Sequence, residues 1–271
     1  MKTILFSKML KEKTPEELVK LALTWGIDGY DLCVRPGYPV NPDNALEELP
    51  KVVKLFRANN LDVPMVTGNF DLLAPDHPTA RPILQAMDKA DVHLVKLGYF
   101  KFDPKVRPYF EEVDRIRGIF AQWEPLAREY GVKICYHTHS GKNMGLNASG
   151  LAHLLAGFDR ACLGAYLDAG HLAAEGEAFP TAVAMVRPYL SIVAVKDVLL
   201  TRVEKNGHGS IKQSWVEAGQ GVVDWTQVFE TLEGIKFAGP ISIHCEFKIP
   251  EAEFLPAATR EIAFFKKFTR K

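Results

Sequence analysis

The chain has 271 residues, of which 47% are hydrophobic and 24% are charged, and its 33 basic and 33 acidic residues give a formal net charge of zero. This composition is that of a globular protein with a large core. Nucleic-acid binding requires clustered basic residues that neutralise phosphates, and the sequence contains no such cluster, so we expect no nucleic-acid partner. No uncharged apolar run approaches the roughly 18 residues needed to span a membrane.

The N-terminal segment and the cysteines indicate where the protein resides. The apolar run near the N-terminus is interrupted by Lys8 and is shorter than the apolar region of a signal peptide. The cysteines are widely spaced and form no C-x-x-C pair, which favours reduced core residues at Cys33, Cys135, Cys162 and Cys245. We therefore expect a cytoplasmic protein without membrane contact.

Short β-rich runs alternate with helical segments along the whole chain. The runs predict strands at 3–8, 29–34, 63–67, 93–97, 133–139, 164–168, 191–197 and 241–247. Helical periodicity predicts helices that include 15–25, 45–58, 108–130, 181–187, 225–235 and 253–268. The first helix begins with an N-cap at Thr14, a proline at its first position and acids in its first turn.

This alternation predicts a parallel sheet with right-handed crossovers. Eight units without a linker or composition break favour a single-domain (β/α)₈ TIM barrel over residues 1–271. The alternative is an open doubly wound sheet, which would place a Gly-rich turn after the first strand. The residues there are Lys8-Met9-Leu10-Lys11, which do not form such a turn. The stretch 198–221 is long for a barrel loop and is predicted to form a lid.

The alternation of side chains along the strands predicts which residues face the barrel interior. In such a barrel the active site lies at the C-terminal ends of the strands. Within 241–247, Ser242, His244 and Glu246 form a polar row on one face. Covering that row with apolar side chains would cost roughly 1–3 kcal/mol for each unpaired polar group. We expect the row to line the interior, with Glu246 near the mouth.

Other strands bring further ionisable groups to the same mouth. His137 and His139 share one face of the fifth predicted strand, and Asp168 ends the sixth, with His171 just beyond it. The same parity adds cations from the second, fourth and seventh strands, namely Arg35, Lys96 and Lys196. Converging imidazoles and carboxylates are typical of a divalent-metal site, with Mn²⁺, Zn²⁺, Mg²⁺ or Co²⁺ as the ion.

Each of these residues also has a structural interpretation. A single strand histidine is more often a hydrogen-bonded core residue than a ligand, but two histidines two residues apart, followed by Asp-x-x-His, favour a site. Lys96 and Lys196 could pair with neighbouring acids, and Asp197 could be a helix or turn cap. Gly219-Gln220-Gly221 follows no strand directly, so we interpret it as a turn before the helix capped by Asp224 rather than a nucleotide loop.

Several short motifs occur in the order found in one known family. They are GIDGYDL at 26–32, LDAGH at 167–171, VKD at 195–197, GQGVVDW at 219–225 and IHCE at 243–246. On these motifs the chain resembles the xylose isomerase-like barrel superfamily, specifically the sugar phosphate isomerase/epimerase group. The resemblance runs from about 26 to 247 and is specific for the superfamily rather than for one substrate.

The resemblance implies a metal site made of a Glu ending the fifth strand, an Asp ending the sixth, a His in the seventh and a Glu ending the eighth. Asp168 and Glu246 match the second and fourth positions, and His171 matches a histidine that touches substrate. The chain departs at the other two positions, which are His137 and Ala194.

These departures bear on the chemistry, because the family's epimerases move a proton with two glutamates that flank the substrate. Here one glutamate of that pair is missing. His137 or His139 could act as the base while Glu246 binds metal, or the reverse, since an imidazole titrates near neutrality. Alternatively, Lys196 or Lys96 could polarise the carbonyl without a metal.

The leading prediction is an isomerase or epimerase that acts on a sugar, keto-sugar or polyol derivative by proton abstraction beside a carbonyl. A divalent ion would be held by His137, Asp168 and Glu246. The predicted catalytic residues are Glu246, His139 and Lys196, and the predicted substrate-binding residues are Arg35, Lys96, His171 and Trp215. Trp215 could stack on a sugar face or hold the lid down.

Three other functions are compatible with the same fold. The first is a lyase or dehydratase on keto-sugars or keto-glycosides, which begins with the same proton abstraction. The second is a non-catalytic barrel that binds a carbohydrate or another protein. The third, a DNA-repair endonuclease, is disfavoured because the sequence lacks a larger His/Asp/Glu set and a basic surface. Homo-oligomerisation, the identity of the sugar and the choice of metal remain open.

Overall fold

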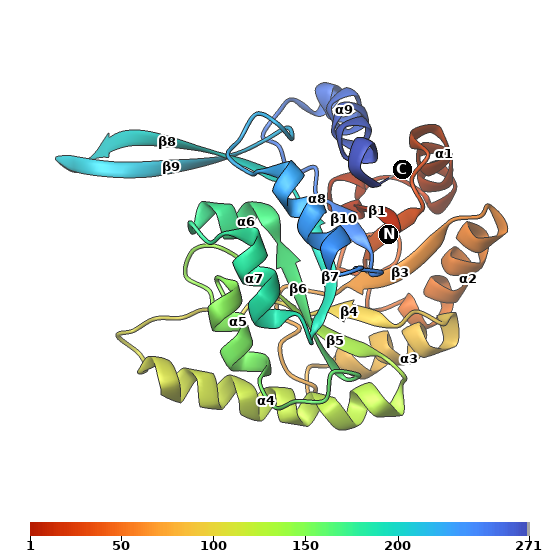
Figure 1. The fold of residues 1–271 in the computed structure, drawn as a ribbon. Helices are drawn as coiled ribbons and strands as arrows, with labels where there is room; N and C mark the ends of the chain where they lie inside the picture. The colour runs from red at the N-terminus through yellow and green to blue at the C-terminus, as the bar shows by residue number, and fades with distance from the viewer. Residues whose placement is uncertain (270–271) are drawn as a thin grey trace.

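The computed structural model describes residues 1–269, and eight parallel strands close into a barrel in the order β1-β10-β7-β6-β5-β4-β3-β2 (Figure 1). The barrel strands are β1 (Thr3–Phe6), β2 (Gly29–Cys33), β3 (Asp62–Thr67), β4 (Leu94–Lys96), β5 (Lys133–His137), β6 (Leu163–Asp168), β7 (Leu190–Val195) and β10 (Ile241–Ile243). The prediction of a (β/α)₈ TIM barrel is therefore confirmed.

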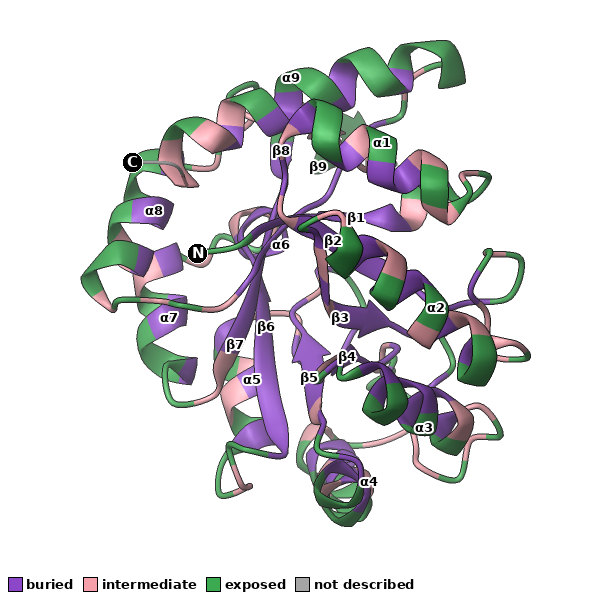
Figure 2. Cartoon of the chain, turned by 90° about the vertical axis from the view of Figure 1, so that its right-hand side faces the viewer, coloured by how far each residue is buried: buried purple, intermediate pink, exposed green. Residues whose placement is uncertain are grey.

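Helices surround the barrel and present their exposed faces to solvent, while the strands at the centre are buried (Figure 2). They are η1 (Ser7–Leu10), α1 (Pro15–Trp25), α2 (Ala45–Ala58), α3 (Ala80–Ala90), α4 (Tyr109–Glu129), α5 (Ala148–Leu155), α6 (Ala169–Ala174), α7 (Phe179–Val186), α8 (Trp225–Gly234) and α9 (Glu251–Thr269). None of the described helices is long and apolar enough to cross a membrane.

Local sequence signals account for several element boundaries. Helix α1 begins with a capping box, in which the Thr14 side chain accepts from Glu17 N and the Glu17 carboxylate accepts from Thr14 N. It ends at Gly26, which adopts a left-handed conformation with φ of 59°. Several predicted strands extend beyond the observed ends, and among them β5 ends at His137 and β10 at Ile243. His139 and Glu246 therefore lie on the loops at the barrel mouth.

The predicted lid segment 198–221 is mostly a regular β-hairpin. Strands β8 (Asp197–Lys205) and β9 (His208–Val216) pair antiparallel and project away from the barrel (Figure 1). The two-residue connection is Asn206-Gly207, both with positive φ, which is the pair that a tight hairpin turn favours. The hairpin root adjoins β7, so Trp215 returns to the barrel mouth.

A polar layer closes the barrel interior below the mouth. The Asp31 carboxylate accepts hydrogen bonds from Thr67 Oγ1 at 2.6 Å and from Ser242 Oγ and Tyr166 Oη at 3.1 Å each. All four residues are fully buried. Because β2, β3, β6 and β10 each supply one member, this layer ties opposite walls of the barrel together and forms the floor of the site.

Candidate active site

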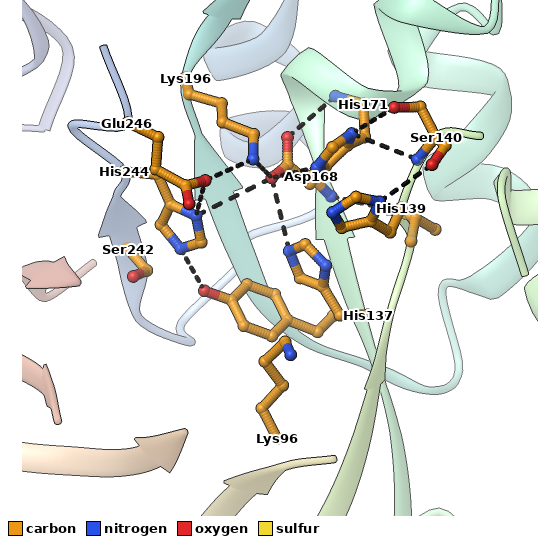
Figure 3. Close-up of polar contacts among 12 residues, drawn as sticks. Lys96, His137, His139, Ser140, Asp168, His171, Lys196, Ser242, His244 and Glu246 are labelled. Carbon is orange, nitrogen blue, oxygen red and sulfur yellow. Dashed lines mark hydrogen bonds and ion pairs between the residues drawn. The ribbon is translucent and has the colours of Figure 1, made fainter. Parts of the chain in front are cut away.

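Asp168 lies at the centre of the barrel mouth, at the end of β6 and at the N-cap of α6 (Figure 3). Its Oδ1 atom accepts a hydrogen bond from His171 N at 2.9 Å, which fixes the carboxylate plane. Its Oδ2 atom faces inward, 3.2 Å from Lys196 Nζ and 3.4 Å from His137 Nε2. His244 Nδ1 and His171 Nε2 each lie 4.0 Å from the same oxygen.

Hydroxyl groups orient the three histidines around Asp168. Tyr99 Oη lies 3.1 Å from His137 Nδ1, Tyr166 Oη lies 2.9 Å from His244 Nε2, and Ser140 Oγ lies 2.8 Å from His171 Nδ1. The remaining nitrogen of each ring is buried without a hydrogen-bond partner among the described residues. Asp168 Oδ2 is buried too, and its charged neighbour is Lys196 Nζ. Hydrogen bonding of the outer nitrogen is how proteins orient the imidazoles that bind metals.

The tautomer of His244 follows from its hydrogen bonds. Tyr166 donates its hydroxyl hydrogen to Asp31, so the same hydroxyl oxygen accepts from His244 Nε2. The unprotonated Nδ1 atom of neutral His244 then faces two carboxylates, Asp168 Oδ2 at 4.0 Å and Glu246 Oε2 at 3.6 Å. Lys196 Nζ supplies positive charge beside both carboxylates, 3.2 Å from Asp168 Oδ2 and 2.8 Å from Glu246 Oε2. The Nδ1 lone pair of His244 is suited to binding a metal ion.

A possible metal site is formed by His137, Asp168 and His244. One ligand atom from each of these buried residues lies within 4.8 Å of the others. Burial lowers the pKa of His137 well below its ordinary value, so this imidazole stays neutral, the form that binds metals. Two imidazoles and one carboxylate whose buried ligand atoms face one another fit a divalent ion.

Hydrogen bonding distinguishes His171 from that set. Its Nδ1 atom accepts from Ser140 N at 3.2 Å, so in the neutral ring the hydrogen is on Nε2. Nε2 is therefore a donor that lies 4.0 Å from Asp168 Oδ2, without a hydrogen-bond partner among the described residues. The ring packs at 4.7 Å from that of Trp215, which also lies 4.5 Å from Lys196 Nζ.

Two lysines hold the Glu246 carboxylate. Lys196 Nζ donates to Oε2 at 2.8 Å and Lys8 Nζ donates to Oε1 at 2.5 Å. Burial opposes ionisation of Glu246, but the charge of Lys196, the His244 contact and Lys8 outweigh it and keep its pKa well below the usual value. Glu246 is thus an ionised acceptor at the edge of the candidate metal site.

The end of β7, which carries Lys196, packs closely against Gly170 in α6. A Cβ atom at Gly170 would lie 2.4 Å from the Lys196 carbonyl oxygen and 2.9 Å from its Cγ. Only glycine permits this approach, so the LDAGH motif positions Lys196 as well as supplying Asp168 and His171.

The structure brings all the sequence-predicted site residues to one mouth. A cavity there is lined by Phe6, Lys8, Arg35, Phe70, Lys96, Tyr99, His137, His139, Lys196, His244 and Glu246. Asp168 lies directly behind this lining, and His171 and Trp215 flank it. His139 Nδ1 lies 2.9 Å from the Ser140 carbonyl, and burial lowers the pKa of His139 to about 4.

Sequence reasoning did not single out His244, Tyr99, Tyr166 or Lys8 as site residues. His244 belongs to the inward polar row of the last strand, and that row was the available signal. Nothing in the pattern around Tyr99 or Lys8 marks them, because both lie beyond the ends of short strands, Tyr99 in a loop after β4 and Lys8 in η1 after β1.

Comparison with solved structures identifies similar folds. D-psicose 3-epimerase from Clostridium cellulolyticum H10, solved with D-tagatose, is 14% identical with a TM-score of 0.74, covering 99% of each chain. The IOLI protein with a binding zinc atom is 16% identical with a TM-score of 0.74, covering 100% of each chain. A probable 3-DHS dehydratase from Bacillus anthracis is 14% identical with a TM-score of 0.73, covering 98% of this chain and 99% of that one.

Comparison with curated proteins finds no match. The family model described as xylose isomerase-like TIM barrel matches residues 19–268, nearly the whole chain, in agreement with the motifs and with the closed barrel. The chain therefore belongs to the xylose isomerase-like TIM barrel family.

Proposed function

We propose that the chain is an isomerase or epimerase of a sugar, keto-sugar or polyol derivative that moves a proton at the carbon beside a carbonyl. One observation carries this proposal. Buried imidazole nitrogens without hydrogen-bond partners converge on Asp168 Oδ2, next to an ionised Glu246 that Lys196 and Lys8 hold in place. Such a site combines a place where a carbonyl oxygen can be polarised with a base that can remove the neighbouring proton.

His137, Asp168 and His244 would hold the divalent ion. Bound there, it would supply Lewis-acid polarisation of a carbonyl oxygen. Imidazole-rich ligation favours Zn²⁺, Mn²⁺ or Co²⁺ over Mg²⁺. The zinc in the IOLI structure supports this choice. Glu246 stays outside this set in our proposal, because each of its oxygens already accepts from a lysine.

Glu246 is the first candidate for the base that removes the proton, since it is ionised and lines the cavity. His139 is the second. In the tautomer that donates Nδ1–H to the Ser140 carbonyl, its Nε2 atom carries the free lone pair. Glu246 follows β10 and His139 follows β5, and β7 and β6 separate these strands in the barrel. Two proton carriers on separate walls suit epimerisation, which handles opposite faces of one carbon.

A lyase or dehydratase is the second candidate function. Elimination begins with the same proton abstraction, and His171 Nε2–H or Lys196 could donate to the departing hydroxyl oxygen. The fold of a probable 3-DHS dehydratase supports this alternative.

The test is turnover of a keto-sugar panel in D₂O with Zn²⁺, Mn²⁺, Co²⁺ or Mg²⁺, followed by NMR. If the enzyme is an isomerase or epimerase, deuterium should appear at one carbon of the product. The mass of the product should then differ from that of the substrate only by this deuterium. Asp168→Asn and Glu246→Gln should each lose activity, whereas the controls Asp88→Asn and Glu217→Gln, on exposed and half-buried surface, should retain it. Loss of water from the product would favour the lyase. No exchange with any substrate would favour a non-catalytic binding barrel.

A further inference from the structure

Two cations in the cavity wall have no carboxylate partner among residues 1–269. Arg35, just beyond β2, and Lys96, at the end of β4, are 5% and 3% exposed. Arg35 Nε donates to the Gly68 carbonyl at 2.8 Å, and Lys96 Nζ donates to the Leu97 carbonyl at 2.9 Å. Neither side chain forms an ion pair with any described acid. Burying a charge without a counter-charge is costly, so such cations in a cavity indicate a missing anion.

The acids of the mouth are already engaged by other groups. Glu246 pairs with Lys8 and Lys196, and Asp168 pairs with Lys196. Deeper in the barrel, the Asp31 carboxylate is held by three hydroxyl groups in the polar floor. Arg35 and Lys96 are therefore the positive charges left over when these pairs are made.

Aromatic rings hold the two cations in place without neutralising them. The Arg35 guanidinium lies 4.2 Å from the centroid of the Phe70 ring and 5.7 Å from that of Phe6, and Lys96 Nζ lies 4.0 Å from that of Tyr99. Stacking on Phe70 and the Nε hydrogen bond fix the guanidinium plane and leave its two terminal nitrogens as donors. Burial, with the nearby charge of Arg35 as a second cause, lowers the pKa of Lys96 to about 7.

The cation pair also lies within reach of the candidate metal site. Phe6 stacks on the His244 ring with centroids 4.5 Å apart, so the same phenyl ring neighbours both Arg35 and a candidate ligand. Tyr99 connects the other cation to the candidate metal site. Its ring lies under Lys96 Nζ, and its hydroxyl oxygen lies within hydrogen-bond distance of His137 Nδ1. A small molecule that reaches the candidate metal site could extend an anionic end to Arg35 and Lys96.

We infer that Arg35 and Lys96 bind an anionic group of the substrate, so that the enzyme acts on a sugar acid or a sugar phosphate rather than on a neutral sugar. A guanidinium with two free terminal nitrogens binds a carboxylate or a phosphate in a bidentate manner, and an ammonium completes the contact. The assignment of a sugar as the carrier of this group rests on the proposed function; the binding of an anion does not.

The experiment compares matched ligands by calorimetry on the metal-loaded full chain. The probes are D-fructose, D-fructose 6-phosphate and a 2-keto-aldonate, with inorganic phosphate and acetate as bare anions. At least one anionic sugar should bind the wild-type protein roughly tenfold to hundredfold more tightly than D-fructose. Preference for the 6-phosphate identifies a phosphate site, and preference for the aldonate identifies a carboxylate site. Equal affinity for neutral and anionic sugars would overturn the inference, and this comparison requires no variant.

Variants locate the anion site. Arg35→Met and Lys96→Met should remove the preference for the anionic sugar, measured in each variant as the ratio of its affinity to that of D-fructose. Arg35→Lys, which keeps the charge but not the bidentate geometry, should retain part of it. The controls Arg187→Met and Lys51→Met, both on exposed surface, should match wild type. An undiminished anion preference in both Met variants would also overturn the inference. If anions bound in a manner that depends on Arg35 but no substrate exchanged a proton, the proposed reaction would be contradicted and the inferred anion site would still hold.

Discussion

Lys196 Nζ lies 3.2 Å from Asp168 Oδ2, the same carboxylate oxygen that lies 3.4 Å from His137 Nε2. Both partners of this ion pair are buried. One oxygen is thus shared between a resident ammonium group and the candidate metal ligands. Because like charges in a buried site repel, the ammonium group and a divalent ion compete for Asp168.

Replacing Lys196 with methionine should therefore change metal affinity and stability in opposite directions. Without the ammonium, Asp168 and Glu246 lose a buried partner, which should lower the free energy of unfolding of the metal-free protein by about 3–5 kcal/mol. Zn²⁺ or Mn²⁺ should bind the variant at least about tenfold more tightly than wild type, since about 1.4 kcal/mol of removed repulsion corresponds to that factor.

Calorimetric metal titration and thermal melting with and without EDTA would measure both effects for Lys196→Met, with Lys51→Met as the surface control. A variant that binds metal no more tightly than wild type would show that Lys196 does not compete for Asp168.

A methyl group at Gly170 should displace Lys196. The added Cβ would lie 2.4 Å from the Lys196 carbonyl oxygen. This contact is too short, so the backbone at Lys196 or at residue 170 must move. We expect Gly170→Ala to cost roughly 1–3 kcal/mol of stability and to lower kcat more than KM, because Lys196 would leave its position between Asp168 and Glu246. Urea denaturation and steady-state kinetics would measure the two effects.

The matched control is Gly118→Ala in α4. A Cβ there meets nothing within 4 Å, and Gly118 is exposed inside a helix. This substitution should stabilise the protein by about 0.5–1 kcal/mol and leave activity unchanged. If both variants kept wild-type kinetics, close packing at Gly170 would have no part in positioning Lys196.

Glu261 should make stability fall as the pH rises. The side chain is 1% exposed, its Oε2 accepts from Ala218 N, and its Oε1 has no partner among the described residues. Burial raises its pKa to about 8 from an ordinary value of 4.5. Between about pH 5 and 8 the folded chain keeps a proton that the unfolded chain has released. The free energy of unfolding therefore falls by at most about 1.4 kcal/mol per pH unit in this window.

Glu261→Gln should remove this dependence. The amide oxygen can still accept from Ala218 N, so the variant should match wild type near pH 5 and exceed it in stability at pH 8. Urea unfolding from pH 5 to 9 measures the difference. Parallel pH profiles for the two proteins would rule out Glu261 as the titrating group.

Asp197 should be the main structural carboxylate of the connection between β9 and α8. Its oxygens accept from the backbone nitrogens of Val198, Gly219, Gly221 and Val223 and from Trp225 Nε1. Asp197→Ala should cost at least about 3 kcal/mol, because the buried donors Val198 N and Trp225 Nε1 and three part-buried backbone nitrogens would lose their acceptor. Asp224→Ala, which removes an exposed helix cap, should cost about 1 kcal/mol. Similar losses in thermal melts of the two variants would contradict this ranking.

Some of this architecture could be predicted from the sequence because the responsible signals are local. The alternation of β-rich and helical segments predicted the barrel, and the Thr14 and Glu17 pair marked the start of α1. The segment 198–221 was expected as a lid, whereas β8 and β9 pair over most of it. Asn206-Gly207, a strong hairpin signal, lay in that segment and would have predicted the turn.

The chain by itself determined which ionisable groups end the strands, since the alternation of side chains is a property of each strand alone. It thereby placed Asp168, His137 and Lys196 on the inward face. Only the tertiary structure decided how they are partnered, because those contacts join residues far apart in the sequence. Closure of β10 against β7 brings His244 toward Asp168 and pairs Glu246 with Lys196, and the Tyr166 hydroxyl selects the tautomer of His244. In the closed barrel, Arg35 and Lys96 donate to backbone carbonyls and form no ion pair with an acid of the described residues, which the pattern of one strand cannot predict.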